Sequence, residues 1–530
     1  MRLIHVAGIA AALAGCWEDK RPIAWERPRT VLGPITLKAQ VAYVDSALDH
    51  VVLLDLEGDK PVEHHIKIGR NAIYAVPSAN QHALFVITAG EEAIHDGEVD
   101  QPPQLWMLDV QHPEARPVGY AISSPFDRLS VSPDNHVAIA YFSEAGTDPN
   151  GFFRNPNELA VVDLDSPPSD TNPTIDTIRS FGSVPTGIAL SPPMVVPFGD
   201  DATPRTFAFI LAENNLTVLD ASHPDRHEVS IRLDLGGAPV IPREVVFAPN
   251  TASAYVRSDH ARDVLQVLLE HQTPVAGDDR ANDFHPVLAE LGAGGGPTDI
   301  AVYDDPLAKR YLLAATPNTG EVVVIDDDTA QFRSIPVADP IDRILLFPSG
   351  GDTPPHEALF ASVGAGSSRL YVLDLDNIAD PLTVAKLDTI QLDKPVRDVV
   401  AVPDRDLAMI VHDDQRTVLG LLDLATESTS PLLGVGKLDA YDFMPDGSHL
   451  IGATTGVSRV GFVALDNLHP TDFRLDDPPV HLVTTANGKI FVDHGDPLGH
   501  ATLIPSPAAA RTDALVLTGF LTADLLDPEP

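Results

Sequence analysis

The chain has 530 residues, about three to four times a typical domain, so it holds either several domains or one large repeat architecture. Hydrophobic residues make up 44% of it and charged residues 21%, which is enough apolar side chain for a buried core and excludes a disordered polymer. The 35 basic and 76 acidic residues give a net charge of −41, which repels nucleic-acid phosphates. We therefore expect no nucleic-acid partner.

The N-terminus has the pattern of a secretory signal. A positive charge at Arg2 precedes an apolar run of small residues that continues to Gly15. The run is shorter than the about twenty apolar residues that a membrane-spanning helix needs, so we expect residues 1–15 to be a cleaved signal peptide. Nothing in the composition of residues 16–36 indicates a packed element, and we expect a tether there.

Four residues at the end of the signal resemble a lipobox. Leu13, Ala14, Gly15 and Cys16 match its pattern, and Cys16 is the single cysteine of the chain. In bacterial lipoproteins the cysteine is acylated and becomes the mature N-terminus, and its acyl chains anchor the protein at roughly 0.8 kcal/mol per buried methylene. The resemblance implies an anchor on Cys16 and, since Trp17 follows, an outer-membrane location. The alternative is an ordinary signal peptide with a chance cysteine.

A repeat runs along the rest of the chain. A short apolar run leads into a turn nine times, at spacings of 42 to 59 residues, and no stretch of ten residues shows helical periodicity. Most copies also contain a later apolar run that ends in aspartate, such as LAVVD at Asp163. Short strands between regular turns predict an all-β array whose unit has the size of a propeller blade. The turns lie at Pro77, Pro133, Pro192, Pro249, Asp304, Pro348, Pro403, Pro445 and Asn487.

The repeat resembles the YVTN-type and WD40-like β-propellers of secreted bacterial proteins. The matching elements are VSPDN at 131–135 and FMPDG at 443–447, each followed by an apolar strand that ends in aspartate. We expect one β-propeller over residues 37–520 with about eight four-stranded blades, seven and nine being the alternatives. Residues 521–530 would form a tail. Strands in residues 41–68 lack an inner partner, so we expect N- and C-terminal strands to pair in one blade and close the ring.

Two acidic insertions are candidates for a metal site. They lie between the second and third strands of consecutive blades, at residues 89–104 and 143–158, and we expect them to be neighbours. Their carboxylates suit calcium, which takes six to eight oxygen ligands, so Ca²⁺ is the cofactor to expect if there is one. The alternative is a pair of solvated loops with no required cofactor. The candidate ligands are Glu91, Glu92, Asp96, Glu98, Asp100, Glu144 and Asp148, with His95 beside them.

The second insertion also carries Phe152, Phe153 and Arg154. Aromatic residues and arginine dominate the binding energy of protein interfaces, so this tip is a candidate partner-binding site. The alternative is that both rings fold back onto the blade. Four arginines at the starts of inner strands are candidates for an anionic ligand at the mouth of the channel, or for salt bridges between blades. They are Arg128, Arg243, Arg343 and Arg397, next to Asp127, Glu244, Asp342 and Asp398.

These features predict a lipid-anchored envelope propeller that binds or scaffolds an envelope protein and catalyses no reaction. No G-x-S-x-G, H-E-x-x-H or C-x-x-C-H pattern occurs in the sequence. The alternative is a lactonase-like hydrolase or lyase with a divalent metal at the channel mouth. An electron-transfer or quinoprotein subunit is a third reading, against which stand the single cysteine, assigned to the lipid, and the lack of a haem-attachment C-x-x-C-H motif.

Overall fold

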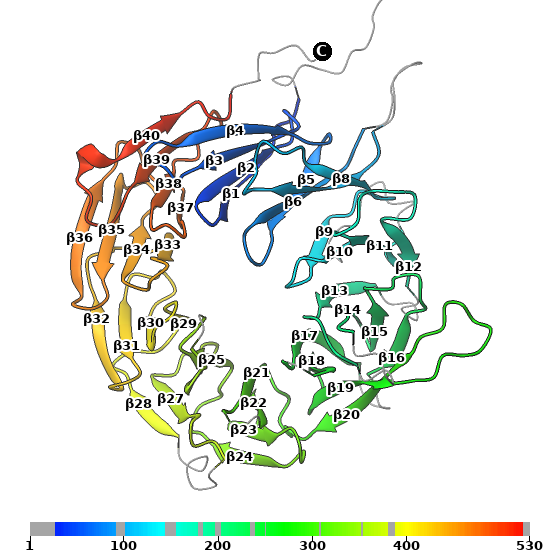
Figure 1. The fold of residues 1–530 in the computed structure, drawn as a ribbon. Coiled ribbons are helices and arrows are strands. Elements are labelled where there is room, and N and C mark those ends of the chain that lie inside the picture. Colours follow the sequence, from blue (N-terminus) through cyan, green and yellow to red (C-terminus); the bar gives the residue numbers. More distant parts are fainter. Residues whose placement is uncertain are drawn as a thin grey trace, which may run out of the picture.

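The computed structural model describes residues 27–91, 101–143, 155–178, 184–196, 203–233, 239–249, 251–306, 309–350, 353–379 and 387–522. Within these residues, forty strands form ten antiparallel sheets of four consecutive strands each. The sheets follow one another around a ring as the blades of a β-propeller, blade 1 being β1 to β4 and blade 10 being β37 to β40 (Figure 1).

Each blade runs from an inner strand beside the ring axis to an outer strand at the rim (Figure 1). The inner strands are β1 (Val31–Leu37), β5 (Ala72–Pro77), β9 (Arg128–Val131), β13 (Pro185–Leu190), β17 (Ile241–Phe247), β21 (Asp299–Asp304), β25 (Arg343–Phe347), β29 (Asp398–Ala401), β33 (Ala440–Phe443) and β37 (His481–Thr484). The second strands are β2 (Gln40–Asp45), β6 (Ala83–Thr88), β10 (Val137–Tyr141), β14 (Phe207–Ala212), β18 (Ser253–Asp259), β22 (Arg310–Thr316), β26 (Glu357–Ala361), β30 (Leu407–Val411), β34 (His449–Ala453) and β38 (Ile490–Asp493).

The third strands are β3 (His50–Asp55), β7 (Gln104–Asp109), β11 (Glu158–Asp163), β15 (Asn215–Asp220), β19 (Val264–His271), β23 (Glu321–Asp326), β27 (Arg369–Asp374), β31 (Leu419–Asp423), β35 (Arg459–Ala464) and β39 (His500–Ile504). The outer strands are β4 (Val62–Lys67), β8 (Val118–Ala121), β12 (Thr174–Thr177), β16 (Val229–Arg232), β20 (Phe284–Leu291), β24 (Phe332–Pro336), β28 (Asp388–Gln391), β32 (Ser428–Leu432), β36 (His469–Arg474) and β40 (Leu515–Thr518). A short 3-10 helix, η2 (Arg511–Asp513), precedes β40.

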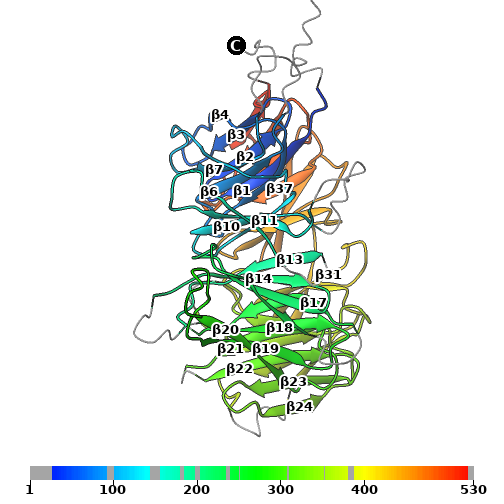
Figure 2. The ribbon, with the colours of Figure 1, turned by 90° about the vertical axis from the view of Figure 1, so that its right-hand side faces the viewer.

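The second and third strands carry the core because both of their faces lie against a neighbouring blade. Every residue of β14 and β15 is buried, for example, so these strands are continuous apolar runs without alternation. Outer strands such as β36 are largely exposed and polar. The buried apolar side chains form ten clusters, and each cluster joins two blades that are neighbours around the ring. Figure 2 shows the same ring from its side.

The recurrent aspartate at the end of the third strand caps the following turn. The Asp55 carboxylate accepts a hydrogen bond from the backbone N–H of Glu57 at 2.8 Å, and the Asp374 carboxylate accepts one from Asp376 at 2.9 Å. Aspartate favours such positions because its short side chain reaches the backbone two or three residues ahead. The recurrent aspartate in the sequence therefore marks the turn that follows the third strand of a blade. The same cap occurs at Asp109, Asp163, Asp220, Asp326 and Asp423.

The expectation of about eight blades, with seven or nine as alternatives, is wrong, because the ring has ten. The nine turn signatures mark nine inner strands, β5 to β37, and the tenth is β1. It lies partly in the stretch expected to be a tether, and it has no proline turn. A register shift between Leu32 and Ile35 interrupts it instead, with Gly33 at a φ of 133°. An added Cβ on Gly33 would lie 2.7 Å from the carbonyl oxygen of Ala42, so only glycine fits this bulge.

Closure by pairing of N- and C-terminal strands is also wrong. Blade 1 has its own inner strand and blade 10 its own outer strand, so neither blade borrows a strand from the other end of the chain. The ring closes by side-chain packing. Tyr43 of blade 1 contacts the rings of Phe491 and Phe520 of blade 10, with centroid distances of 6.3 and 5.4 Å, inside the apolar cluster that joins the two blades.

Polar side chains connect successive blades through a recurring contact. In several blades a side chain reaches the turn after the third strand of the next blade. Gln40 of blade 1 donates to the carbonyl oxygen of Val110 in blade 2, and Arg405 of blade 8 pairs with Asp466 of blade 9. Lys489 of blade 10 makes the same contact with blade 1. The junction between the chain ends is therefore built like the others.

Candidate functional site

The two acidic insertions follow β6 and β10, the second strands of blades 2 and 3. Of their seven candidate calcium ligands, only Glu91 lies within the described residues. Its backbone forms a two-way bridge with Gln101, at 2.8 and 2.9 Å, and its carboxylate pairs with Arg70 at 2.7 Å. Glu91 is thus part of the base of the loop. The positions outside the described residues are Glu92, His95, Asp96, Glu98, Asp100, Glu144, Asp148, Phe152, Phe153 and Arg154, together with Leu13, Ala14, Gly15 and Cys16.

All four candidate channel arginines are exposed. Arg128 and Arg343 begin β9 and β25, Arg397 directly precedes β29, and Arg243 is the third residue of β17. They belong to blades 3, 5, 7 and 8, so only Arg343 and Arg397 are in neighbouring blades. Arg243 pairs with Asp259 at 2.6 Å and Arg397 with Asp414 at 3.5 Å, in both cases within the same blade. Arg128 lies over the ring of Tyr74 in the preceding blade, 5.8 Å from its centroid. These three arginines therefore have separate partners and do not form a common clamp.

The acidic residues next to these arginines hold their own blades together. The Asp127 carboxylate accepts hydrogen bonds from the backbone N–H and the hydroxyl of Ser143, at 2.7 and 3.1 Å. The Asp342 carboxylate accepts two backbone N–H bonds, from Val363 at 2.7 Å and from Gly364 at 2.6 Å. Each of these contacts fixes the loop between the second and third strands. Their role is structural, which weakens the case for an anion site at the mouth.

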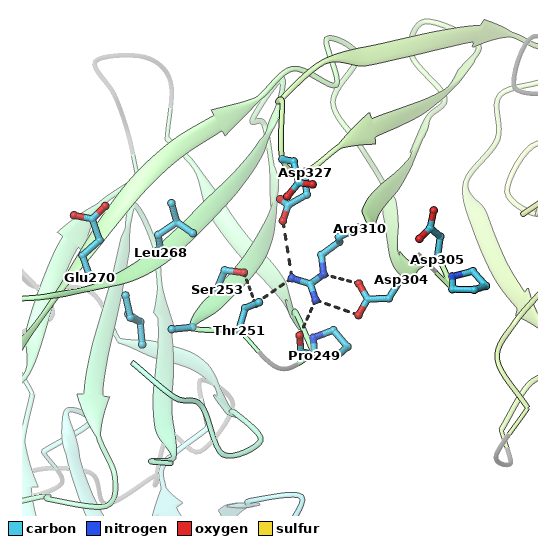
Figure 3. Close-up of a pocket in the computed structure, with 13 residues that line it drawn as sticks. Pro249, Thr251, Ser253, Leu268, Glu270, Asp304, Asp305, Arg310 and Asp327 are labelled. Atoms are coloured by element: carbon cyan, nitrogen blue, oxygen red, sulfur yellow. Dashed lines mark hydrogen bonds and ion pairs between the residues drawn. The ribbon is translucent and has the colours of Figure 1, made fainter. Parts of the chain in front are cut away.

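A large cleft lies elsewhere, between blades 5 and 6 (Figure 3). Its volume is about 690 Å³. It opens on the face formed by the turns between first and second strands and between third and fourth strands. This is opposite the face on which the insertions and the arginines lie. Its lining residues are Pro249, Thr251, Ala252, Ser253, Leu268, Leu269, Glu270, Asp304, Asp305, Pro306, Arg310, Asp327 and Asp328.

Arg310, the first residue of β22, is the centre of this cleft (Figure 3). Its Nε and Nη2 atoms donate to the two carboxylate oxygens of Asp304 at 2.7 and 3.1 Å, a bidentate pair. Nη2 also donates to the carbonyl oxygen of Pro249 at 2.6 Å, and Nη1 donates to the Thr251 hydroxyl at 3.1 Å. Asp327 lies 4.0 Å from Nη1. Arg310 thereby joins the first turn of blade 5 to blade 6 and is a fixed part of the wall.

The back of the cleft is electrostatically unusual. Gln266 of blade 5 donates to the Asp327 carboxylate at 2.7 Å. Burial raises the pKa of Asp327 above its usual value, and the neighbouring Arg310 offsets this only in part. Burial also raises the pKa of Tyr255, as does the nearby Asp327 carboxylate. The Tyr255 ring is fully buried behind the lining of the cleft.

The rest of the lining combines negative charge with apolar surface. Leu268 and Ala252 line the blade 5 side, and exposed Glu270 stands at the end of the same wall. Asp328 is exposed on the blade 6 side. The cleft as a whole carries five carboxyl groups and one guanidinium. Such a surface suits a ligand that has a positive charge and an apolar stem.

A second cleft, of about 630 Å³, lies between blades 3 and 4 on the same face. His136 and Asp165 line it and form an exposed pair at 2.6 Å. The amide of Asn172 supports its outer loop by donating to the carbonyl oxygens of Asp163 and Ser166, at 2.8 and 3.0 Å. Most of its lining consists of short polar side chains engaged in turns, so it offers less apolar surface than the cleft at Arg310.

Among the described residues, no three His, Cys, Asp or Glu side chains are grouped so that they could hold a metal ion. No helix in the same part of the chain is long and apolar enough to cross a membrane.

No protein-family model matches the chain, and no curated protein matches it. Many solved structures match it, and two examples show how weak the likeness is. One is "Dihydro-heme d1 dehydrogenase NirN in complex with DHE", with 14% identity, a TM-score of 0.40, and coverage of 86% of this chain and 76% of that chain. The other is "Crystal structure of the eukaryotic initiation factor", with 11% identity, a TM-score of 0.45, and coverage of 91% and 96%. Likenesses at this level carry no inference about function. The ten-bladed propeller is established by the sheets of the chain itself.

Proposed function

We propose that the protein is a lipid-anchored β-propeller of the bacterial cell envelope that binds a partner protein and catalyses no reaction. The lipobox at Leu13 to Cys16 supports the anchor. The cleft at Arg310 carries the binding role, because it is large, lies between two blades and has an internally neutralised arginine. The Arg310 guanidinium donates hydrogen bonds to a carboxylate, a carbonyl and a hydroxyl of the protein itself. It therefore fixes the shape of the cleft wall and is not available as a nucleophile or a proton donor toward a substrate.

The anchor is tested by metabolic labelling with an alkyne-bearing fatty acid in a Gram-negative host. The full chain should incorporate the label and fractionate with the outer membrane, and Cys16→Ser should do neither. Label on the Cys16→Ser chain, or a wild-type chain released without label, would contradict the proposal.

The absence of catalysis is tested on the full chain, purified gently and assayed with lactone and sugar-ester substrates while its metal content is measured. We expect no turnover above that of the heat-denatured protein. Turnover that a chelator removes together with a bound divalent metal would replace the proposal with the hydrolase alternative.

A further inference from the structure

Two neighbouring blades expose apolar side chains on the face opposite the cleft at Arg310. This face carries the loops between the second and third strands. The structure describes these loops in full in blade 1 and in blades 4 to 10, and only those of blades 9 and 10 expose a large apolar side chain. The two side chains are Val457, which is 41% exposed, and Leu498, which is 51% exposed.

The two loops belong to one surface, because the connection from blade 9 to blade 10 lies between them. The N–H of Leu475 in this connection donates to the carbonyl oxygen of Ser458 at 3.1 Å. Val480, at the other end of the connection, is 44% exposed, and an added Cβ on Gly495 would lie 2.8 Å from its side chain. We refer to Val457, Val480 and Leu498 as the apolar loop surface.

The N-terminal end of the described chain lies at the same place. Arg29 donates to the carbonyl oxygens of Pro497 and Leu521 at 2.6 and 2.7 Å, and Pro497 directly precedes Leu498. Blades 9, 10 and 1 follow one another around the ring (Figure 1). The covalent chain from Cys16 to Arg27 can span at most about 40 Å. An acyl chain on Cys16 would therefore keep the apolar loop surface within about 40 Å of the membrane.

We propose that the apolar loop surface lies against the lipid bilayer that holds the acyl chains of Cys16. Apolar side chains at the membrane interface gain free energy because they leave water. A short link to the membrane also gives an effective concentration on the order of millimolar, so a weak contact is enough to orient the propeller. The cleft at Arg310 opens on the opposite face and would point away from the membrane. The inference rests on the proposed function for the anchor.

The charge of the protein selects the kind of lipid. Asp477 and Asp496 are exposed in the same segments as Val480 and Leu498, and the chain has a net charge of −41. Anionic headgroups would be repelled by these carboxylates. The surface therefore fits a bilayer of zwitterionic lipid, with apolar contact as the source of binding.

The test couples the chain from Cys16 onward, which keeps all ten blades, to phosphatidylcholine vesicles that contain a maleimide lipid. Cys16 is the single cysteine, so coupling occurs there. Amide hydrogen exchange is compared with that of the same chain coupled to a soluble maleimide. We expect exchange to slow about fivefold in residues 454–458 and 494–499 and to stay unchanged in the turn at residues 326–331 on the opposite face. No protection, or equal protection of both faces, would overturn the inference.

Matched variants identify the side chains responsible. The double variant Val457→Ser and Leu498→Ser should lose the protection. The double variant Val195→Ser and Val275→Ser removes two exposed apolar side chains from the opposite face and should keep it. The variant Leu498→Trp should increase the protection, because tryptophan favours the membrane interface. Equal loss in the two double variants would overturn the inference.

The composition of the vesicles distinguishes other occupants of this surface. Vesicles of phosphatidylglycerol should protect the loops less than phosphatidylcholine does, because of Asp477 and Asp496. Stronger protection on phosphatidylglycerol would show a contact driven by charge and overturn the inference. Protection that appears only when the vesicles contain envelope proteins would make the occupant a protein and would also overturn it.

Coupling through the maleimide lipid separates this inference from the proposed function, because it does not depend on acylation in the cell. A chain that is acylated at Cys16 in the host but is unprotected on the vesicles refutes the membrane contact and leaves the anchor standing. A chain that is protected on the vesicles but is not acylated in the host refutes the anchor and supports the apolar loop surface as a lipid-binding surface.

Discussion

The ammonium nitrogen of Lys489 lies 2.6 Å from the carbonyl oxygen of Leu56, 433 residues earlier in the chain. The same nitrogen lies 2.6 Å from the carbonyl oxygen of Gly58, and the side-chain amide of Asn487 donates to Leu56 at 3.0 Å. On the other face, Arg29 donates to the carbonyl oxygens of Pro497 and Leu521, at 2.6 and 2.7 Å. Polar contacts on both faces therefore hold the first blade to the last, without strand exchange.

The variant Lys489→Met should destabilise the ring at this junction. It removes two charge-assisted hydrogen bonds, one to Gly58 and one to Leu56, which keeps only the Asn487 amide as a donor. We therefore expect a loss of about 2–3 kcal/mol in the free energy of unfolding, measured in urea. Amide hydrogen exchange should accelerate first in β1 to β4 and β37 to β40. The matched variant Lys60→Met, at an exposed lysine, should change neither quantity. A uniform acceleration in all ten blades would contradict a local role for Lys489.

The variant Arg310→Met should destabilise the junction between blades 5 and 6. It leaves the Asp304 and Asp327 carboxylates without their shared guanidinium, and we expect a loss of about 2–4 kcal/mol in urea. Arg310→Lys should recover only part of the loss, since an ammonium cannot form the bidentate pair with Asp304. In a double-mutant cycle, Asp304→Asn and Arg310→Met should be clearly non-additive. Additive losses would show that the bidentate pair contributes little.

The all-β propeller class could be predicted from the sequence, because strands buried between two blades are apolar runs that end in recognisable turns. Nine of the ten inner strands precede such a turn. The blade number could not be predicted, because β1 achieves its shape with a bulge at Gly33 and a turn at Lys38 and has no proline signature. Short outer strands such as β40 carry even less signal, since they are largely exposed and bury little.

The cleft at Arg310 could not be predicted from the sequence for a related reason. Two of the nine turn signatures depart from the repeat by lacking the proline, with Asp304 in one and Asn487 in the other. Asp304 is the bidentate partner of Arg310, and Asn487 contacts blade 1 at the ring closure. The partner of each of these side chains, in the next strand or blade, could be found only from the fold.

The pH dependence of stability on the acid side should depend in part on Asp283, which precedes β20 and reaches blade 4. Its carboxylate lies 3.0 Å from Arg205 and 2.7 Å from Arg226. Burial acts to raise the pKa of Asp283, but the two guanidiniums more than offset this and hold it below the usual value. The stabilising contribution is therefore complete above the unfolded pKa of about 3.9 and is lost as the pH falls through the lower folded value.

The variant Asp283→Asn should accordingly be less stable than the wild type by about 1–3 kcal/mol at pH 7. The difference should narrow as the pH falls below about 4, because the wild-type carboxyl then becomes neutral as well. Urea unfolding at several pH values measures this. The variant Asp279→Asn, an exposed position in the same loop, should follow the wild type throughout. A difference that stays constant down to pH 2 would show that packing and not charge is responsible.

On the alkaline side, the relevant group is Tyr371 in blade 7. Its hydroxyl donates to the Asp339 carboxylate at 2.6 Å, and the same carboxylate forms a bidentate pair with Arg369 at 2.8 and 3.0 Å. Burial, and then the hydrogen bond and charge of Asp339, raise the pKa of Tyr371 to about 12. Because this pKa is raised on folding, its contribution to stability is complete below the unfolded value of about 10 and is lost as the pH rises to about 12.

The absorbance of ionised tyrosine near 295 nm, followed by stopped-flow mixing before the protein unfolds, tests this pKa. Subtracting the titration of Tyr371→Phe from that of the wild type should leave one ionisation near pH 12. The variant Asp339→Asn should move that ionisation to lower pH, because the phenolate then loses its negatively charged neighbour while Arg369 remains. Tyr303, whose pKa burial also raises to about 12, does not contact Asp339 and should titrate unchanged in this variant. A single ionisation near pH 10 for Tyr371 would mean that the bond to Asp339 does not form in solution.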